Sequence, residues 1–85
     1  MRDFDIVIYG ATGFTGRLVA EYLTQTYPSG VRWAMAGRSL AKLQEVRDLI
    51  GAPADTPLVT AESDDPASLR AMADRATVVI STVGP

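Results

Sequence analysis

Apolar and polar positions follow two alternating patterns along the chain. Short runs rich in apolar residues occupy positions 4–9, 31–36, 57–60 and 77–81, and each has the length and composition of a β-strand. The stretches between these runs repeat their apolar residues every three or four positions, which is the period of an amphipathic helix. The sequence therefore predicts four strands separated by three helices.

The expected helices cover 14–26, 39 to about 50, and a third stretch in which Asp65 is the N-cap and Pro66 the first helical residue. Gly51 follows the second helix and is expected to end it. The residues expected to face the sheet are Leu18, Val19, Tyr22 and Leu23 in the first helix, Leu40, Leu43, Val46 and Ile50 in the second, and Leu69, Met72 and Ala73 in the third.

Strands that alternate with helices form a parallel sheet, and right-handed crossovers restrict the order of its strands. We expect an α/β fold with strand order 3-2-1-4, the first two helices on one face and the third on the other, which is the Rossmann arrangement. The fourth strand is apolar on both faces and stands at an edge of this sheet. It is therefore expected to pair with the remainder of a longer chain or to self-associate.

The segment 10–16 reads Gly-Ala-Thr-Gly-Phe-Thr-Gly and lies between the first strand and the first helix. Gly10 permits a tight turn, Gly13 leaves room for a pyrophosphate against the backbone, and Gly16 lets the helix lie close to the sheet. Unpaired N–H groups at the helix start bind phosphates with the help of the helix dipole. Such a turn also needs glycine for purely structural reasons, but a second strand one helix later favours a dinucleotide site.

Arg38 follows the second expected strand and lies about 20 positions after Gly16, where an NAD site carries an acidic residue. A guanidinium binds a 2′-phosphate through paired hydrogen bonds, the Ser39 hydroxyl adds a donor, and Lys42 lies one helical turn further. In the alternative interpretation, Ser39 is only the N-cap of the next helix and both cations are solvated. We expect NADP as the cofactor.

The carboxyl ends of the first and fourth strands meet at the point where the strand order reverses, and ligands bind there in this fold. After the third strand, Asp64 is placed to accept a hydrogen bond from an adenine amino group, in competition with Glu62 and Asp65, of which Asp65 is the expected helix cap. The residues that follow the fourth strand at this point are Thr82, Val83, Gly84 and Pro85.

The composition argues against several other classes of function. The chain has 85 residues and a net charge of −2, and its eight basic residues are scattered, so no nucleic-acid site is expected. It contains neither Cys nor His, which excludes a disulfide framework and removes the commonest metal ligands. The apolar runs are too short to insert into a membrane, and residues 1–5 lack the regions of a signal peptide. We expect a cytoplasmic protein without a metal.

Residues 5–16, residues 36–39 with 42–43, and residues 79–85 together resemble the N-terminal part of the saccharopine dehydrogenase-like oxidoreductases, including the bacterial trans-acting enoyl reductase branch. The resemblance implies NADP-dependent hydride transfer. It also implies that the cofactor contacts Gly10, Thr12, Gly13, Phe14, Thr15 and Gly16, that its 2′-phosphate contacts Arg38 and Ser39, and that Thr82 to Pro85 pass its ribose.

We therefore expect a dinucleotide-binding domain over residues 1–85 that is the N-terminal part of a longer oxidoreductase. No catalytic residue can be named in it, because substrate-binding and proton-donating groups would lie beyond Pro85, and the isolated chain is expected to bind the cofactor without turnover. Two alternatives stay open. One is a regulator that senses NADP without consuming it, and the other is an atypical short-chain dehydrogenase whose Tyr and Lys pair would lie further along the chain.

Overall fold

Strands and helices alternate along the computed structural model, which describes residues 3–27 and 30–82. The elements are β1 (Phe4–Tyr9), α1 (Phe14–Thr26), β2 (Trp33–Gly37), α2 (Leu40–Leu49), β3 (Leu58–Thr60), α3 (Pro66–Asp74) and β4 (Ala76–Ser81). These are the expected elements, with end points shifted by one or two residues. As expected, Asp65 caps α3, since its Oδ1 accepts hydrogen bonds from the N–H groups of Ala67 at 3.1 Å and Ser68 at 3.4 Å.

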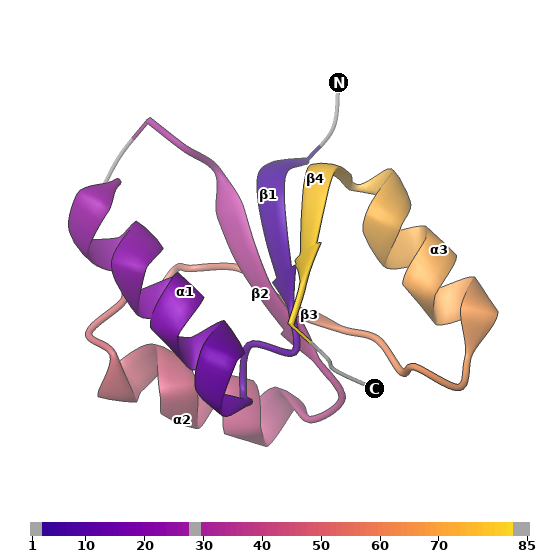
Figure 1. Cartoon of the computed structure of the whole chain (residues 1–85), viewed down its shortest axis with the longest axis horizontal. Coiled ribbons are helices and arrows are strands. Elements are labelled where there is room, and N and C mark those ends of the chain that lie inside the picture. The colour runs from indigo at the N-terminus through magenta and orange to yellow at the C-terminus, as the bar shows by residue number, and fades with distance from the viewer. Residues whose placement is uncertain (1–2, 28–29, 83–85) are drawn as a thin grey trace.

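The four strands form one parallel sheet in the order β3-β2-β1-β4. Figure 1 shows α1 and α2 on one side of this sheet and α3 on the other. The predicted strand order and the predicted distribution of the helices are therefore confirmed. Because all strands run the same way, the loops that follow β1, β2, β3 and β4 gather at one edge of the sheet, where ligands bind in Rossmann folds.

Each face of the sheet carries its own hydrophobic core, because side chains alternate between the faces along a strand. On the α3 face, Val7 and Tyr9 of β1 pack in one cluster with Met72. On the α1 and α2 face, Ile8 packs with Leu43 and with residues of β2. This second cluster includes Trp33, the single tryptophan of the chain, which is 7% exposed at the start of β2.

The sheet-facing side of α1 differs from the prediction. Leu18 and Tyr22 are 47% and 58% exposed, whereas Gly16, Ala20 and Leu23 are buried. The small residues Gly16 and Ala20 let the helix backbone approach the sheet closely, and the helical period then turns Leu18 and Tyr22 away from it. The prediction was also wrong for Leu40 of α2, which is 48% exposed, and for Ala73 of α3, which is exposed.

At the amino end of the sheet, an ion pair ties β1 to the residue before β2. Asp5 Oδ2 accepts a hydrogen bond from the Arg32 backbone N–H at 2.9 Å, and its Oδ1 lies 3.1 Å from Arg32 Nη2. The backbone hydrogen bond first, and the guanidinium second, lower the pKa of the Asp5 carboxyl. This contact lies at the opposite end of the strands from the expected ligand site.

Strand β4 forms one edge of the described sheet, as expected. It pairs with β1, and Val78 is 51% exposed on the face that α3 does not cover. Val79, on the other face, packs against the core beneath α3. Among the described residues, no helix has the length and apolar character needed to cross a membrane.

Candidate nucleotide site at the carboxyl edge of the sheet

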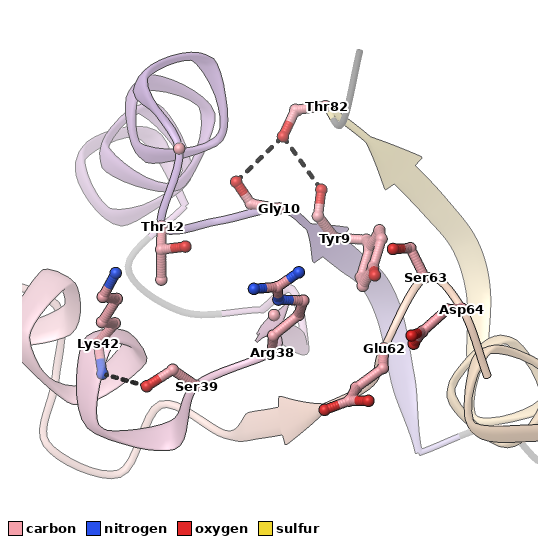
Figure 2. Close-up of a pocket in the computed structure, with 12 residues that line it drawn as sticks. Tyr9, Gly10, Thr12, Arg38, Ser39, Lys42, Glu62, Ser63, Asp64 and Thr82 are labelled. Carbon is pink, nitrogen blue, oxygen red and sulfur yellow. Dashed lines mark hydrogen bonds between the residues drawn. The ribbon is translucent and has the colours of Figure 1, made fainter. Parts of the chain in front are cut away.

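A cavity of about 630 Å³ lies at the carboxyl edge of the sheet. It is open to one side, and Figure 2 shows residues from β1, β2 and the loop after β3 around it. Predicted site residues that line it are Gly10, Thr12, Gly13, Arg38, Ser39, Lys42, Asp64 and Thr82. Glu62, which the sequence offered as a competitor of Asp64, also lines it, and so do Tyr9, Gly37 and Ser63, which the sequence did not assign to the site.

The loop from Gly10 to Gly13 is held by backbone hydrogen bonds. Gly10 has a φ of +87°, a conformation that glycine adopts without strain. The N–H groups of Gly10 and Ala11 both donate to Ala36 O, at 3.0 and 3.1 Å, and Gly13 N–H donates to Gly10 O at 3.0 Å. The loop is thereby attached to β2 and folded back on itself.

Gly13 is the N-cap residue of α1, and no side chain caps this helix. A Cβ atom at Gly13 would meet only the carbonyl oxygen of Gly10, at 3.4 Å, which is an ordinary contact. The first-turn N–H groups of a helix have no partner within the helix. The arrangement therefore offers backbone donors and a positive dipole end beside the cavity, without a side chain from Gly13 over them.

Gly16 fills a packing role. It is buried, and an added Cβ atom would overlap the Gly10 carbonyl oxygen and lie 2.7 Å from the Gly10 carbonyl carbon and 2.8 Å from Thr82 Oγ1. This is the close approach of helix to sheet that the glycine motif predicts. Gly16 is not among the residues that line the cavity, and neither are Phe14 and Thr15, which are exposed on the first turn of α1.

Cationic and hydroxyl side chains gather where β2 ends. Figure 2 shows the Arg38 guanidinium projecting into the cavity and the Lys42 side chain rising beside Thr12. Ser39 Oγ accepts a hydrogen bond from the Lys42 N–H at 3.3 Å and is the N-cap of α2. Ser39 therefore caps the helix and lines the cavity at the same time, so the two interpretations of this residue are compatible.

Two carboxylates lie on the opposite wall, in the loop after β3. Glu62 and Asp64 both line the cavity, and Asp65 does not. The Glu62 backbone N–H donates to Ser68 Oγ at 3.0 Å, which attaches this loop to the first turn of α3. Their negative charge lies across the cavity from the cations Arg38 and Lys42.

Thr82 follows β4 and closes the cavity beside β1. Its Oγ1 donates to Tyr9 O at 3.0 Å and lies 3.2 Å from Gly10 O, as the dashed lines in Figure 2 mark. Its backbone N–H also donates to Tyr9 O, at 3.0 Å. The remaining residues predicted on this side, Val83, Gly84 and Pro85, lie outside the described residues.

Two of the unassigned lining residues have a signal in the sequence. Tyr9 and Gly37 are the last residues of β1 and β2, and strand ends at this edge are where ligands bind. Tyr9 is a core residue, only 7% exposed, and it also lines the cavity. Within the described part of the chain, no group of three or more acidic side chains is placed to hold a metal ion.

Comparison with known proteins agrees with this geometry. The model of the saccharopine dehydrogenase NADP binding domain matches residues 6–85. The trans-acting enoyl reductase of Mycobacterium leprae (strain TN) is 54% identical over 85 residues, and those of Mycobacterium tuberculosis (strain ATCC 25618 / H37Rv) and Mycobacterium bovis (strain BCG / Pasteur 1173P2) are 53% identical. The chain spans 20% of the length of each of these relatives. No solved structure matches. The chain belongs to the saccharopine dehydrogenase family of NADP-binding domains, and its cofactor is NADP(H).

Proposed function

We propose that the cavity at the carboxyl edge holds NADP(H) in one orientation. The pyrophosphate lies over the loop from Gly10 to Gly13, where backbone N–H groups and the positive end of α1 meet its charge. The adenosine lies between the ends of β2 and β3, with the 2′-phosphate on Arg38 and Ser39 and the adenine amino group toward Asp64.

The observation that carries this proposal is the charge at the end of β2. Arg38 and Lys42 line the cavity there, and Ser39 between them presents a hydroxyl. An NAD site places a carboxylate at this position to accept hydrogen bonds from the ribose, and that carboxylate would repel a 2′-phosphate. The carboxylates of this cavity, Glu62 and Asp64, belong instead to the loop after β3.

We further propose that the bound cofactor serves reduction of an enoyl group. The support is that the relatives are named trans-acting enoyl reductases and that the chain belongs to an NADP-binding family. When bound, NADPH supplies a hydride. The residues of this chain bind the cofactor and orient it, and the groups that hold the unsaturated substrate and donate a proton belong to sequence outside this segment.

The first prediction concerns Arg38. The unmutated chain is expected to bind NADPH more tightly than NADH by about 1.5 to 3 kcal/mol, the range for hydrogen bonds to a charged group. Arg38→Ala is expected to remove most of this difference and to leave NADH binding nearly unchanged, because the guanidinium meets only the 2′-phosphate. Isothermal titration calorimetry with both nucleotides measures the two affinities.

The matched control is Arg70→Ala, which removes the same charge from an exposed position on α3 that does not line the cavity. This variant is expected to keep the preference for NADPH. Equal affinity of the unmutated chain for the two nucleotides, or an equal loss of preference in both variants, contradicts the assignment of Arg38.

The second prediction concerns turnover. A protein of the relatives' length that carries this segment is expected to oxidise NADPH when an enoyl compound is supplied, and to consume one NADPH for each double bond reduced. Absorbance of the reduced nicotinamide follows the reaction. Tight NADPH binding without oxidation of the nucleotide by any enoyl or carbonyl compound would instead support the alternative of a redox-sensing regulator.

A further inference from the structure

The end of β4 is bonded to the glycine loop through a single side chain. Thr82 Oγ1 lies 3.0 Å from Tyr9 O and 3.2 Å from Gly10 O, and both are backbone carbonyls at the end of β1. The family resemblance assigns this threonine to the cofactor ribose. Its hydroxyl, however, is hydrogen-bonded to the loop backbone, as the dashed lines in Figure 2 mark.

The Gly10 carbonyl contacts three parts of the site: the glycine loop, the residue after β4, and α1. It accepts from Gly13 N–H at 3.0 Å within the loop, it lies in hydrogen-bond range of Thr82 Oγ1, and the missing side chain of Gly16 leaves room for it against α1. On the other side of the loop, Gly10 N–H is bonded to Ala36 O of β2. The loop is thus held from β2 by backbone groups and from β4 by the Thr82 hydroxyl.

Hydrogen bonds of this kind restrict the backbone most at a glycine, because glycine has more backbone conformations to lose than any other residue. Gly10 adopts a positive φ, and its peptide groups set the direction of the loop that follows. A loop that is already fixed in its bound conformation loses less entropy when a ligand binds, and therefore binds more tightly.

We infer that Thr82 is a positioning residue for the pyrophosphate. Its hydroxyl shares one proton between the carbonyls of Tyr9 and Gly10 and thereby orients the loop that presents N–H groups to the two phosphates. The inference rests on the proposed function, which places the pyrophosphate on this loop. It assigns Thr82 an effect on the phosphates through the backbone of β1, and no direct contact with the ribose.

The two carbonyls keep a partner when the hydroxyl is removed. Tyr9 O still accepts from the Thr82 backbone N–H, and Gly10 O still accepts from Gly13 N–H. Removal of the hydroxyl therefore leaves neither carbonyl without a hydrogen bond, and the loss of stability is expected to be small. The effect on ligand binding can then be separated from an effect on folding.

The test compares Thr82→Val and Thr82→Ala, which lack the hydroxyl, with Thr82→Ser, which keeps it. Calorimetric titrations use three probes: adenosine 2′-monophosphate, which has no 5′-phosphate; 2′-phosphoadenosine 5′-diphosphate, which has both phosphates but no second ribose; and NADPH. In the valine and alanine variants, affinity is expected to fall about three- to tenfold for the second and third probes and to stay unchanged for the first. Serine is expected to restore both affinities.

Each other outcome overturns the inference in a different way. An equal loss for all three probes means that Thr82 acts only on stability, which thermal unfolding of the same variants would show. A loss for NADPH alone means that Thr82 contacts the second ribose directly. Unchanged affinity for all three probes means that the hydroxyl has no role in binding. Failure of the unmutated chain to bind NADPH overturns the proposed function, and the inference with it.

Discussion

Gly16→Ala is expected to destabilise the fold by about 3 kcal/mol, the upper end of the range for overpacking. The added Cβ atom would overlap the carbonyl oxygen of Gly10, and its other close neighbours are the Gly10 carbonyl carbon and Thr82 Oγ1. Alanine favours a helix over glycine by about 1 kcal/mol, but this gain cannot offset a clash with backbone that is fixed in β1. Urea unfolding followed by circular dichroism measures the change.

The control is the same substitution three positions earlier. A Cβ atom at Gly13 meets only Gly10 O, at 3.4 Å, so Gly13→Ala loses only the N-cap preference for glycine, about 1 kcal/mol. It is expected to unfold at a urea concentration much closer to that of the unmutated chain than Gly16→Ala does. A Gly16→Ala chain that unfolds at the same concentration as the Gly13→Ala chain would show that α1 and β1 do not approach each other as closely as the structure has them.

Gly13→Val is expected to reduce NADPH affinity at least about a hundredfold, equivalent to about 3 kcal/mol, while the fold is kept. The branched side chain would occupy the space where the phosphates approach the N-terminal end of α1. Valine at an N-cap costs the helix at most about 1 kcal/mol relative to glycine, so the loss of binding is much larger than the loss of stability. Calorimetry gives the affinity, and urea unfolding gives the stability.

The two glycine variants are therefore expected to have opposite profiles. In Gly16→Ala the larger effect is on stability, and in Gly13→Val the larger effect is on NADPH binding. Normal NADPH binding by the valine variant would contradict the placement of the pyrophosphate over this loop.

The strand order could be predicted from the sequence because few orders are possible for four parallel strands joined by helices. The order of strands comes from the handedness of the crossovers, and the start of α3 comes from Asp65 and Pro66, whose roles are local. The roles of Gly10 and Gly16 are local too, since one is a turn and the other is the first close contact of a helix with the strand before it. Interactions between near neighbours in sequence are the ones that a pattern can predict.

The buried side of α1 could not be predicted from the sequence, because the residues that pack against the sheet there are small. Leu18 and Tyr22 form the larger apolar pair, and a search for an apolar stripe selects them. The helix packs through Gly16 and Ala20, because small residues permit the closest approach to the sheet. Apolar pairs lie on more than one side of α1, and only the packing in three dimensions selects the side with the small residues.

The sequence predicted most of the residues that line the site, but it did not predict the hydrogen bonds that they make. Arg38, Ser39 and Asp64 belong to the loops that follow β2 and β3, so their presence at the cavity follows from topology. The orientation of the Thr82 hydroxyl does not, since it depends on two carbonyls that lie more than 70 positions away in the sequence. Tyr9 shows a related limit, because a side chain at the end of a buried strand contributes to the core and to the cavity together.

The position of Trp33 is expected to make its fluorescence respond to the bound cofactor. The residue is buried at the start of β2, and Gly37 at the other end of this strand lines the cavity. Four steps along a strand cover about 13 Å. Indole emits light in the range that a reduced nicotinamide absorbs, so the reduced cofactor, held in the cavity, would take up the excitation of Trp33 by resonance transfer. The oxidised cofactor lacks this absorption, and the fluorescence of one native side chain would thus distinguish the two redox states without any label.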